Sequence, residues 1–278
     1  MSVVTFLGTG KEQSGKTLAV AAIATNMAIE RNKRILVISV SNDTETLKNC
    51  YWKEELTTKK NTMFGLEGKV ELDSGIEGLA KIIQSNRVSP NLITDYTSVV
   101  FKERLEILIG FDEKTLYSPE NVSKIYKEIV NLATQYYDMV IVDLDNEIGR
   151  IGVDEILNRS DVIVAMTSQR LASIKKMKSK IGNSLPTSKT ILLIGRHDRK
   201  SKYTIKNLTR MLGEKKEILT IPYNTLFFEA AQEGNVADLF LKLRRIEDKN
   251  DTNSFFMEQV KKVNQEIIKK IEESELRR

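Results

Sequence analysis

The chain has 278 residues, of which 41% are hydrophobic and 29% are charged, so it can bury a sizeable core and is neither disordered nor fibrous. It carries one cysteine, which excludes an internal disulfide, and no stretch approaches the roughly 20 apolar residues of a membrane span. The first apolar run is too short for a signal peptide, so we expect a cytoplasmic protein.

Short apolar runs alternate with longer segments of helical pattern. The runs span residues 3–7, 35–40, 105–109, 139–142, 162–165, 191–194 and 218–221. They are continuous, as in parallel strands that are covered on both faces. Lys16–Glu30 predicts a buried helix, and Ser118 and Pro119 begin another as N-cap and first turn. This order predicts an α/β fold with a doubly wound, mostly parallel sheet and helices on both faces.

The remaining segments suggest one domain with a C-terminal extension. Residues 57–74 look like a loop, and the polar residues 247–254 look like a linker. We therefore expect a domain at residues 1–246, and a linker with an amphipathic helix at residues 247–278.

That helix has a narrow apolar stripe at helical spacing, formed by Phe256, Val260, Val263, Ile267 and Ile271. Residues 255–278 hold six basic and five acidic side chains, a balance that gives little attraction to anionic lipids. We expect the stripe to pack on the domain or on a partner helix, and not on a membrane.

A phosphate-binding motif follows the first apolar run. The pattern G-x-x-x-x-G-K-[ST] is matched at every specified position, and its residues are Gly10, Lys11, Glu12, Gln13, Ser14, Gly15, Lys16 and Thr17. Such a loop points backbone N–H groups at phosphates. Lys16 is predicted to reach the β and γ phosphates of a nucleotide, and the Thr17 hydroxyl to hold Mg²⁺.

Basic side chains are concentrated in one segment. Residues 170–216 contain fourteen Lys or Arg and two acidic residues, a net charge of +12, whereas the rest of the chain has −7. This segment is either a solvated face or a surface for the phosphates of duplex DNA, without sequence specificity. The candidates are Lys175, Lys176, Arg199, Lys200, Lys202, Lys206 and Arg210.

Two further residues have reactive side chains. His197 lies between charged neighbours and is expected to be a solvated loop residue, which argues against a histidine-based triad or zinc site. Cys50 lies beside two aromatic residues and is expected to pack in the core.

The phosphate loop resembles the deviant Walker A loop of the ParA/MinD family, because Lys11 lies five residues before Lys16. The resemblance implies an ATP-bound homodimer in which Lys11 reaches the partner's nucleotide. It extends over most of residues 1–245. Residues 137–143 resemble the Walker B strand, so that Asp143 would hold Mg²⁺ through water. Arg196 and Pro222 resemble residues on the base side of the nucleotide.

The chain departs from the family pattern at four places, one of which is Gly195, where relatives often have an asparagine before the arginine. Glu12 and Gln13 replace two glycines, and residues 144–149 lack the prolines and glycine of switch II. Ser41 occupies the position of an aspartate that assists hydrolysis, for which Asp43 is a candidate substitute. ATP binding is therefore better supported than efficient turnover.

These features predict an atypical ParA/MinD-like protein with ATP and Mg²⁺ as cofactors and weak ATPase activity. It would act as a dimeric switch that positions DNA or a cell-surface or conjugation machine with a protein partner or cargo. The alternatives are a hydrolysis-deficient scaffold that localises a complex, and a metabolic P-loop enzyme. Iron–sulfur proteins of this fold contribute two cysteines per subunit, and this chain has one.

Overall fold

A computed structural model describes residues 1–8, 13–41, 43–53, 75–85, 89–111, 115, 117–145, 149–212, 218–246, 248 and 251–276. The strands are β1 (Ser2–Leu7), β2 (Ile35–Val40), β3 (Ser98–Phe101), β4 (Leu105–Leu108), β5 (Met139–Leu144), β6 (Val162–Thr167), β7 (Thr190–His197) and β8 (Leu219–Pro222). The helices are α1 (Lys16–Glu30), α2 (Thr44–Asn49), α3 (Ile76–Gln84), the 3₁₀ helix η1 (Pro90–Tyr96), α4 (Pro119–Tyr136), α5 (Gly149–Arg159), α6 (Leu171–Lys180), α7 (Ile205–Leu212), α8 (Thr225–Gln232), α9 (Val236–Leu243) and α10 (Thr252–Glu275).

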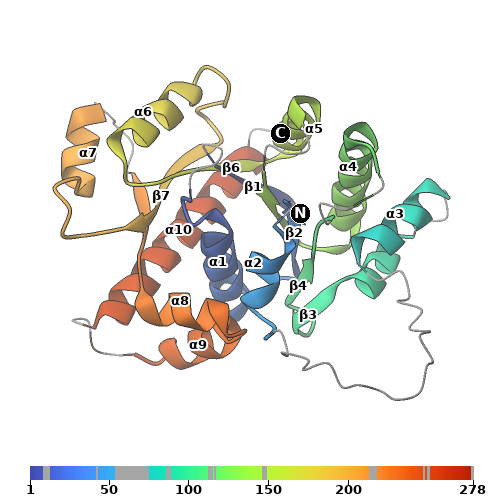
Figure 1. The fold of residues 1–278 in the computed structure, drawn as a ribbon, viewed down its shortest axis with the longest axis horizontal. Coiled ribbons are helices and arrows are strands. Elements are labelled where there is room, and N and C mark those ends of the chain that lie inside the picture. The colour runs from blue at the N-terminus through green and yellow to red at the C-terminus, as the bar shows by residue number, and fades with distance from the viewer. Residues whose placement is uncertain are drawn as a thin grey trace, which may run out of the picture.

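The eight strands form one sheet in the order β3-β4-β2-β5-β1-β6-β7-β8. Every pairing is parallel except that of β3 with β4. The predicted doubly wound, mostly parallel sheet is confirmed. Because the central strands run in parallel, the carboxyl ends of β1, β2, β5, β7 and β8 meet at one edge of the sheet, which positions the candidate site (Figure 1).

Each central strand contributes apolar side chains to both faces of the sheet. Val4 and Phe6 of β1 join the core under α1, α9 and α10, whereas Val3 and Leu7 join the core under α3, α4 and α5. This arrangement follows from the alternation of side chains along a strand, and it accounts for the continuous apolar runs in the sequence. α6 and α7 cover a smaller core beside β7 (Figure 1).

The C-terminal helix α10 packs on the domain. Its stripe residues are buried, and α10 contacts α1 and β8. Phe256 stacks on Phe227 with 5.0 Å between ring centroids and meets Phe240 edge-on at 6.1 Å. The helix begins at Thr252, inside the polar stretch expected to be a linker, because the Asp251 side chain accepts a hydrogen bond from the Asn253 N–H and caps it. Within the described ranges, no helix is both long and apolar enough to cross a bilayer.

Two local predictions were wrong and one is outside the described residues. Strand β3 was missed, because it is a short edge strand whose first two residues, Ser98 and Val99, are exposed. His197 is not a solvated loop residue: it ends β7, is 4% exposed, and its burial lowers the pKa of the imidazole. The loop predicted at residues 57–74 lies outside the described residues.

We predict that Phe256→Ala lowers the free energy of unfolding by about 3–5 kcal/mol, because it removes a fully buried ring from the contact between α10 and the domain. The measurement is urea unfolding followed by circular dichroism. The control is Leu276→Ala, whose side chain is 89% exposed at the end of the same helix and should cost less than about 0.5 kcal/mol. Equal effects of the two substitutions would contradict the packing of α10 described above.

Candidate functional site

The carboxyl edge of the sheet brings together residues that are far apart in the sequence. The phosphate loop follows β1, Ser41 follows β2, Asp143 lies near the end of β5, and Arg196 and Pro222 lie at the ends of β7 and β8. Gly10, Lys11 and Glu12 lie outside the described residues, so their predicted roles stay predictions. Gln13 is exposed and Ser14 is buried.

Helix α1 begins directly after the loop with Gly15 in a left-handed conformation, at φ 73°. A side chain there would be strained, and its Cβ would lie 2.9 Å from Cγ of Arg196, which explains the glycine. Among the described residues no side chain caps this helix. Its first backbone N–H groups are therefore available to an anion, and the helix dipole favours a phosphate there.

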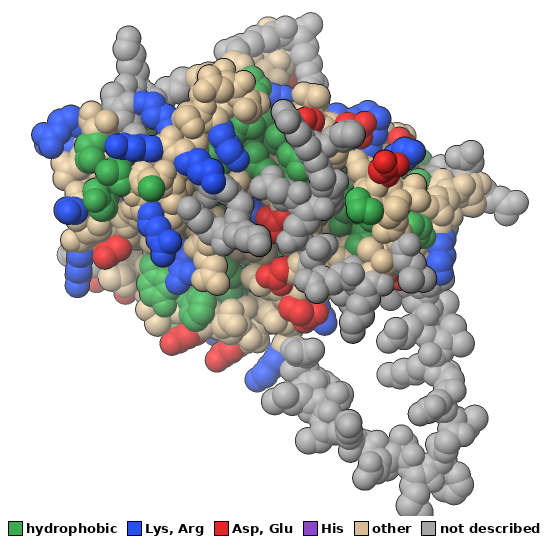
Figure 2. Space-filling view, turned by 45° about the horizontal axis from the view of Figure 1, so that its top comes forward, with side chains coloured by type: hydrophobic (Ala, Val, Ile, Leu, Met, Phe, Trp, Pro, Cys, Tyr) green, Lys and Arg blue, Asp and Glu red, His purple; other side chains and the backbone are tan. Residues whose placement is uncertain are grey.

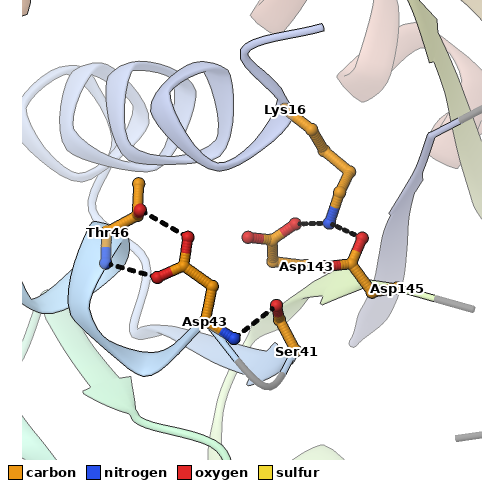
Figure 3. A network of polar contacts seen from close by, with 6 residues as sticks. All are labelled: Lys16, Ser41, Asp43, Thr46, Asp143 and Asp145. Atoms are coloured by element: carbon orange, nitrogen blue, oxygen red, sulfur yellow. Dashed lines mark hydrogen bonds and ion pairs between the residues drawn. The ribbon is translucent and has the colours of Figure 1, made fainter. Parts of the chain in front are cut away.

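Lys16 lies between two carboxylates, that of Asp143 in β5 and that of Asp145, the residue that follows β5. Its Nζ contacts Oδ1 of Asp143 and lies 3.0 Å from Oδ1 of Asp145 (Figure 3). Burial by itself would lower the pKa of Lys16, but the two negative charges outweigh that effect and raise it, so the ammonium is charged at neutral pH. The Lys16 side chain is 8% exposed and that of Asp143 is fully buried, whereas that of Asp145 is 35% exposed.

Asp143 and Thr17 fit the predicted Mg²⁺. Oδ2 of Asp143 is buried and has no hydrogen-bond partner among the described residues, which is costly unless a ligand satisfies it. Thr17 is half-buried in the first turn of α1. Mg²⁺ takes few protein oxygens and completes its coordination with phosphate and water, so a carboxylate and a hydroxyl suffice. When bound, the ion would neutralise charge on the β and γ phosphates.

Asp43 is the N-cap of α2. Its carboxylate accepts hydrogen bonds from the N–H and the hydroxyl of Thr46, at 3.0 and 2.6 Å, and its own N–H donates to Oγ of Ser41 at 3.1 Å (Figure 3). Both oxygens are thus engaged in starting a helix, a contact worth about 1 kcal/mol. This arrangement gives Asp43 a structural role, whereas the carboxylates that contact Lys16 in the described part of the chain are those of Asp143 and Asp145.

The predicted base-side residues adjoin the phosphate loop. Arg196 has a left-handed backbone, at φ 51°, and its side chain packs on Gly15. The preceding Gly195 approaches the carbonyl of Ser14 so closely that a Cβ would lie 2.0 Å from that oxygen. A small cavity joins this region to β8, and its lining includes Gly15, Leu18, Arg196, Pro222, Tyr223 and Phe227.

A larger groove of about 830 Å³ continues from Arg196 and Pro222. It is lined by basic and aromatic side chains, including Arg199, Tyr223 and Phe255. The Arg199 guanidinium lies 4.0 Å from the centre of the Phe255 ring, a cation–π contact. The groove therefore offers apolar faces and positive charge beside the phosphate loop, which suits the base and ribose of a nucleotide.

All seven DNA-binding candidates are exposed and lie on α6, on α7 or between β7 and α7. Figure 2 shows Lys and Arg side chains gathered on this side of the molecule. We call this surface, formed by Lys175, Lys176, Arg199, Lys200, Lys202, Lys206 and Arg210, the basic face. Its geometry is compatible with phosphate contacts.

Two other side chains have no catalytic arrangement. Cys50 is fully buried at the end of α2, as expected, and burial raises the pKa of its thiol to about 12, so it is not a nucleophile at neutral pH. His197 is buried at the end of β7.

Asp145 is the site residue that the sequence did not reveal, because its contact with Lys16 joins segments more than a hundred residues apart.

No family model matches this chain, and no curated protein sequence matches it. Solved structures match over nearly the whole length. A ParA family ATPase from Chlorobium tepidum has a TM-score of 0.66 and 18% identity, and the match covers 95% of this chain and 98% of that one.

Two further structures agree. The septum site-determining protein MinD from Pyrococcus horikoshii, complexed with Mg-ADP, has a TM-score of 0.64, 15% identity and coverage of 97% of this chain and 99% of that one. A putative plasmid partition protein from Borrelia burgdorferi, bound to AMPPNP, has a TM-score of 0.60, 16% identity and coverage of 96% and 99%. This chain therefore has the P-loop fold of the ParA and MinD ATPases.

Proposed function

We propose that this protein is a ParA/MinD-like ATPase that binds Mg-ATP at the phosphate loop and acts as an ATP-dependent dimeric switch. The observation that carries the proposal is the position of Lys16, a buried ammonium at the start of an uncapped helix, beside the buried and incompletely satisfied Asp143. The bound AMPPNP and Mg-ADP of two structural neighbours support the choice of ligand.

In the proposed complex, the phosphates lie against the N-terminus of α1, and Lys16 leaves the carboxylates for the β and γ phosphates. Thr17 and Asp143 hold Mg²⁺. The base lies beside Arg196 and Pro222, where the loop, β7 and β8 converge. Nucleotide binding favours a dimer, slow hydrolysis resets it, and the switch positions DNA or a protein machine.

We predict that Lys16→Ala weakens ATP binding at least a hundredfold, because it removes the cation from the phosphates. Thr17→Ala should bind ATP about tenfold more weakly in Mg²⁺ and equal the wild type in EDTA, because only its metal contact is lost. The measurement is titration with a fluorescent ATP analogue.

Because Lys16→Ala leaves Asp143 without its cation, its fold must be checked by circular dichroism, and Thr17→Ala supplies an independent test. Wild-type protein that does not bind ATP, or a folded Lys16→Ala that binds as tightly as the wild type, would disprove the proposal. Tight binding without turnover would instead favour the scaffold function.

The dimer proposal rests on Lys11. We expect Lys11→Ala to abolish ATP-dependent dimerisation, because Lys11 would contact the partner's nucleotide. The ATP dissociation constant of the monomer should stay within about threefold of the wild-type value. Sedimentation velocity with and without Mg-ATP measures this, with Lys242→Ala, an exposed lysine of α9, as control. A wild-type chain that stays monomeric with saturating ATP would overturn the switch.

The exposure and clustering of the basic face support non-specific binding of duplex DNA. We predict that the triple variant Lys202→Gln, Lys206→Gln and Arg210→Gln weakens DNA binding. The slope of the logarithm of the binding constant against the logarithm of the salt concentration should become shallower by the equivalent of up to about three phosphate contacts. The control triple Lys242→Gln, Arg245→Gln and Lys269→Gln removes the same charge from exposed positions elsewhere. An equal loss of DNA affinity in both triple variants, or an affinity that does not depend on salt, would contradict DNA binding by the basic face.

A further inference from the structure

Asp145 follows β5 at the carboxyl edge of the sheet, and Ser41 follows the neighbouring strand β2. Its backbone N–H donates to the carbonyl of Val40 at 3.0 Å, which continues the parallel pairing of β2 and β5. Because Val40 pairs with Leu144, the next positions of the two strands are Ser41 and Asp145, on neighbouring strands about 4.8 Å apart. Asp145 is therefore beside Ser41 at the carboxyl edge of the sheet.

The side chain of Asp145 contacts the lysine that is proposed to bind the phosphates. Oδ1 of Asp145 lies 3.0 Å from Nζ of Lys16, the atom proposed to contact the γ phosphate (Figure 3). A carboxylate that contacts this lysine lies near the proposed phosphate position, where a general base has to hold the attacking water.

Exposure separates the two carboxylates. Asp143 is fully buried and fits a metal ion, whereas the side chain of Asp145 is 35% exposed and accessible to water. Asp43, another acidic residue near this edge, uses both oxygens in contacts with Thr46 at the start of α2. Of the carboxylates that the structure describes at this edge, Asp145 alone combines contact with Lys16 and exposure to solvent.

We propose that Asp145 is a catalytic residue, the general base that orients and deprotonates the water that attacks ATP. The inference rests on the proposed ATP site. Movement of Lys16 onto the phosphates releases Asp145, so the base becomes available only when the nucleotide is bound.

In this step the water oxygen forms a bond to the γ phosphorus, and the bond between that phosphorus and the β–γ bridging oxygen breaks. The electron pair of the broken bond stays on ADP. The proton of the water passes to Asp145, which returns it to solvent, and inorganic phosphate leaves.

The experiment compares Asp145→Asn with wild-type protein, with two readouts: the ATP dissociation constant and the rate of phosphate release in a single turnover. Loss of a general base lowers the rate by about 10²-fold or more. ATP binding should be unchanged or tighter, because the asparagine no longer competes with phosphate for Lys16. Asp43→Asn, which can still cap α2, tests the rival carboxylate, and the exposed Asp95→Asn is the matched control and should keep the wild-type rate.

A rate for Asp145→Asn within about threefold of the wild type would overturn the proposal, as would a hundredfold loss in Asp43→Asn alone. Tighter ATP binding with an unchanged rate would reduce Asp145 to a competitor for Lys16. Wild-type protein that binds ATP but releases no more phosphate than Lys16→Ala would overturn the role of Asp145 and leave ATP binding intact. Wild-type protein that binds no ATP would overturn both the proposed ATP site and the role of Asp145.

Discussion

The structure of the site depends on one buried positive charge. Lys16 is held at the start of α1, and its ammonium faces the carboxylates of Asp143 and Asp145. Burying a lysine is costly, and only opposite charges in contact with it keep it protonated there. In the proposed nucleotide complex, the Lys16 ammonium exchanges these carboxylates for phosphate groups. This exchange links the folded scaffold to the proposed switch.

The scaffold brings that charge and its partners together through strand order. β1 lies between β5 and β6 in the sheet, and Lys16 at the start of α1 meets the end of β5. β7 and β8 bring Arg196 and Pro222 to the same edge, and Gly195 lets the end of β7 touch the backbone of Ser14. α10 packs against α1 in the same hydrophobic core, so the C-terminal helix supports the helix that carries Lys16. Packing far from the site therefore stabilises its geometry.

Local patterns predicted much of this and missed what depends on tertiary contacts. Apolar runs identified the central strands, because a strand buried on both faces is continuously apolar. The stripe on α10 predicted that it would pack, although the sequence could not say on which surface. β3 escaped because Ser98 and Val99 are exposed at the sheet edge. His197 was misjudged because its charged neighbours suggest a loop, whereas β7 extends through it.

The candidate site shows the same division. The spacing of Gly10, Gly15, Lys16 and Thr17 was sufficient to predict the phosphate loop. The role of Asp145 could not be predicted, because it depends on the register of β2 with β5 and on the direction of one lysine side chain. In the sequence Asp43 was the candidate, and only the structure shows that its carboxylate contacts Thr46 at the start of α2 while Asp145 contacts Lys16.

The most direct test of the account is a crystal structure of the protein with Mg²⁺ and AMPPNP. We predict that Nζ of Lys16 lies within hydrogen-bond distance of the β and γ phosphate oxygens and has left Asp145, whose carboxylate then faces the γ phosphorus. A nucleotide bound elsewhere, or one bound at the loop while Lys16 stays between Asp143 and Asp145, would contradict it.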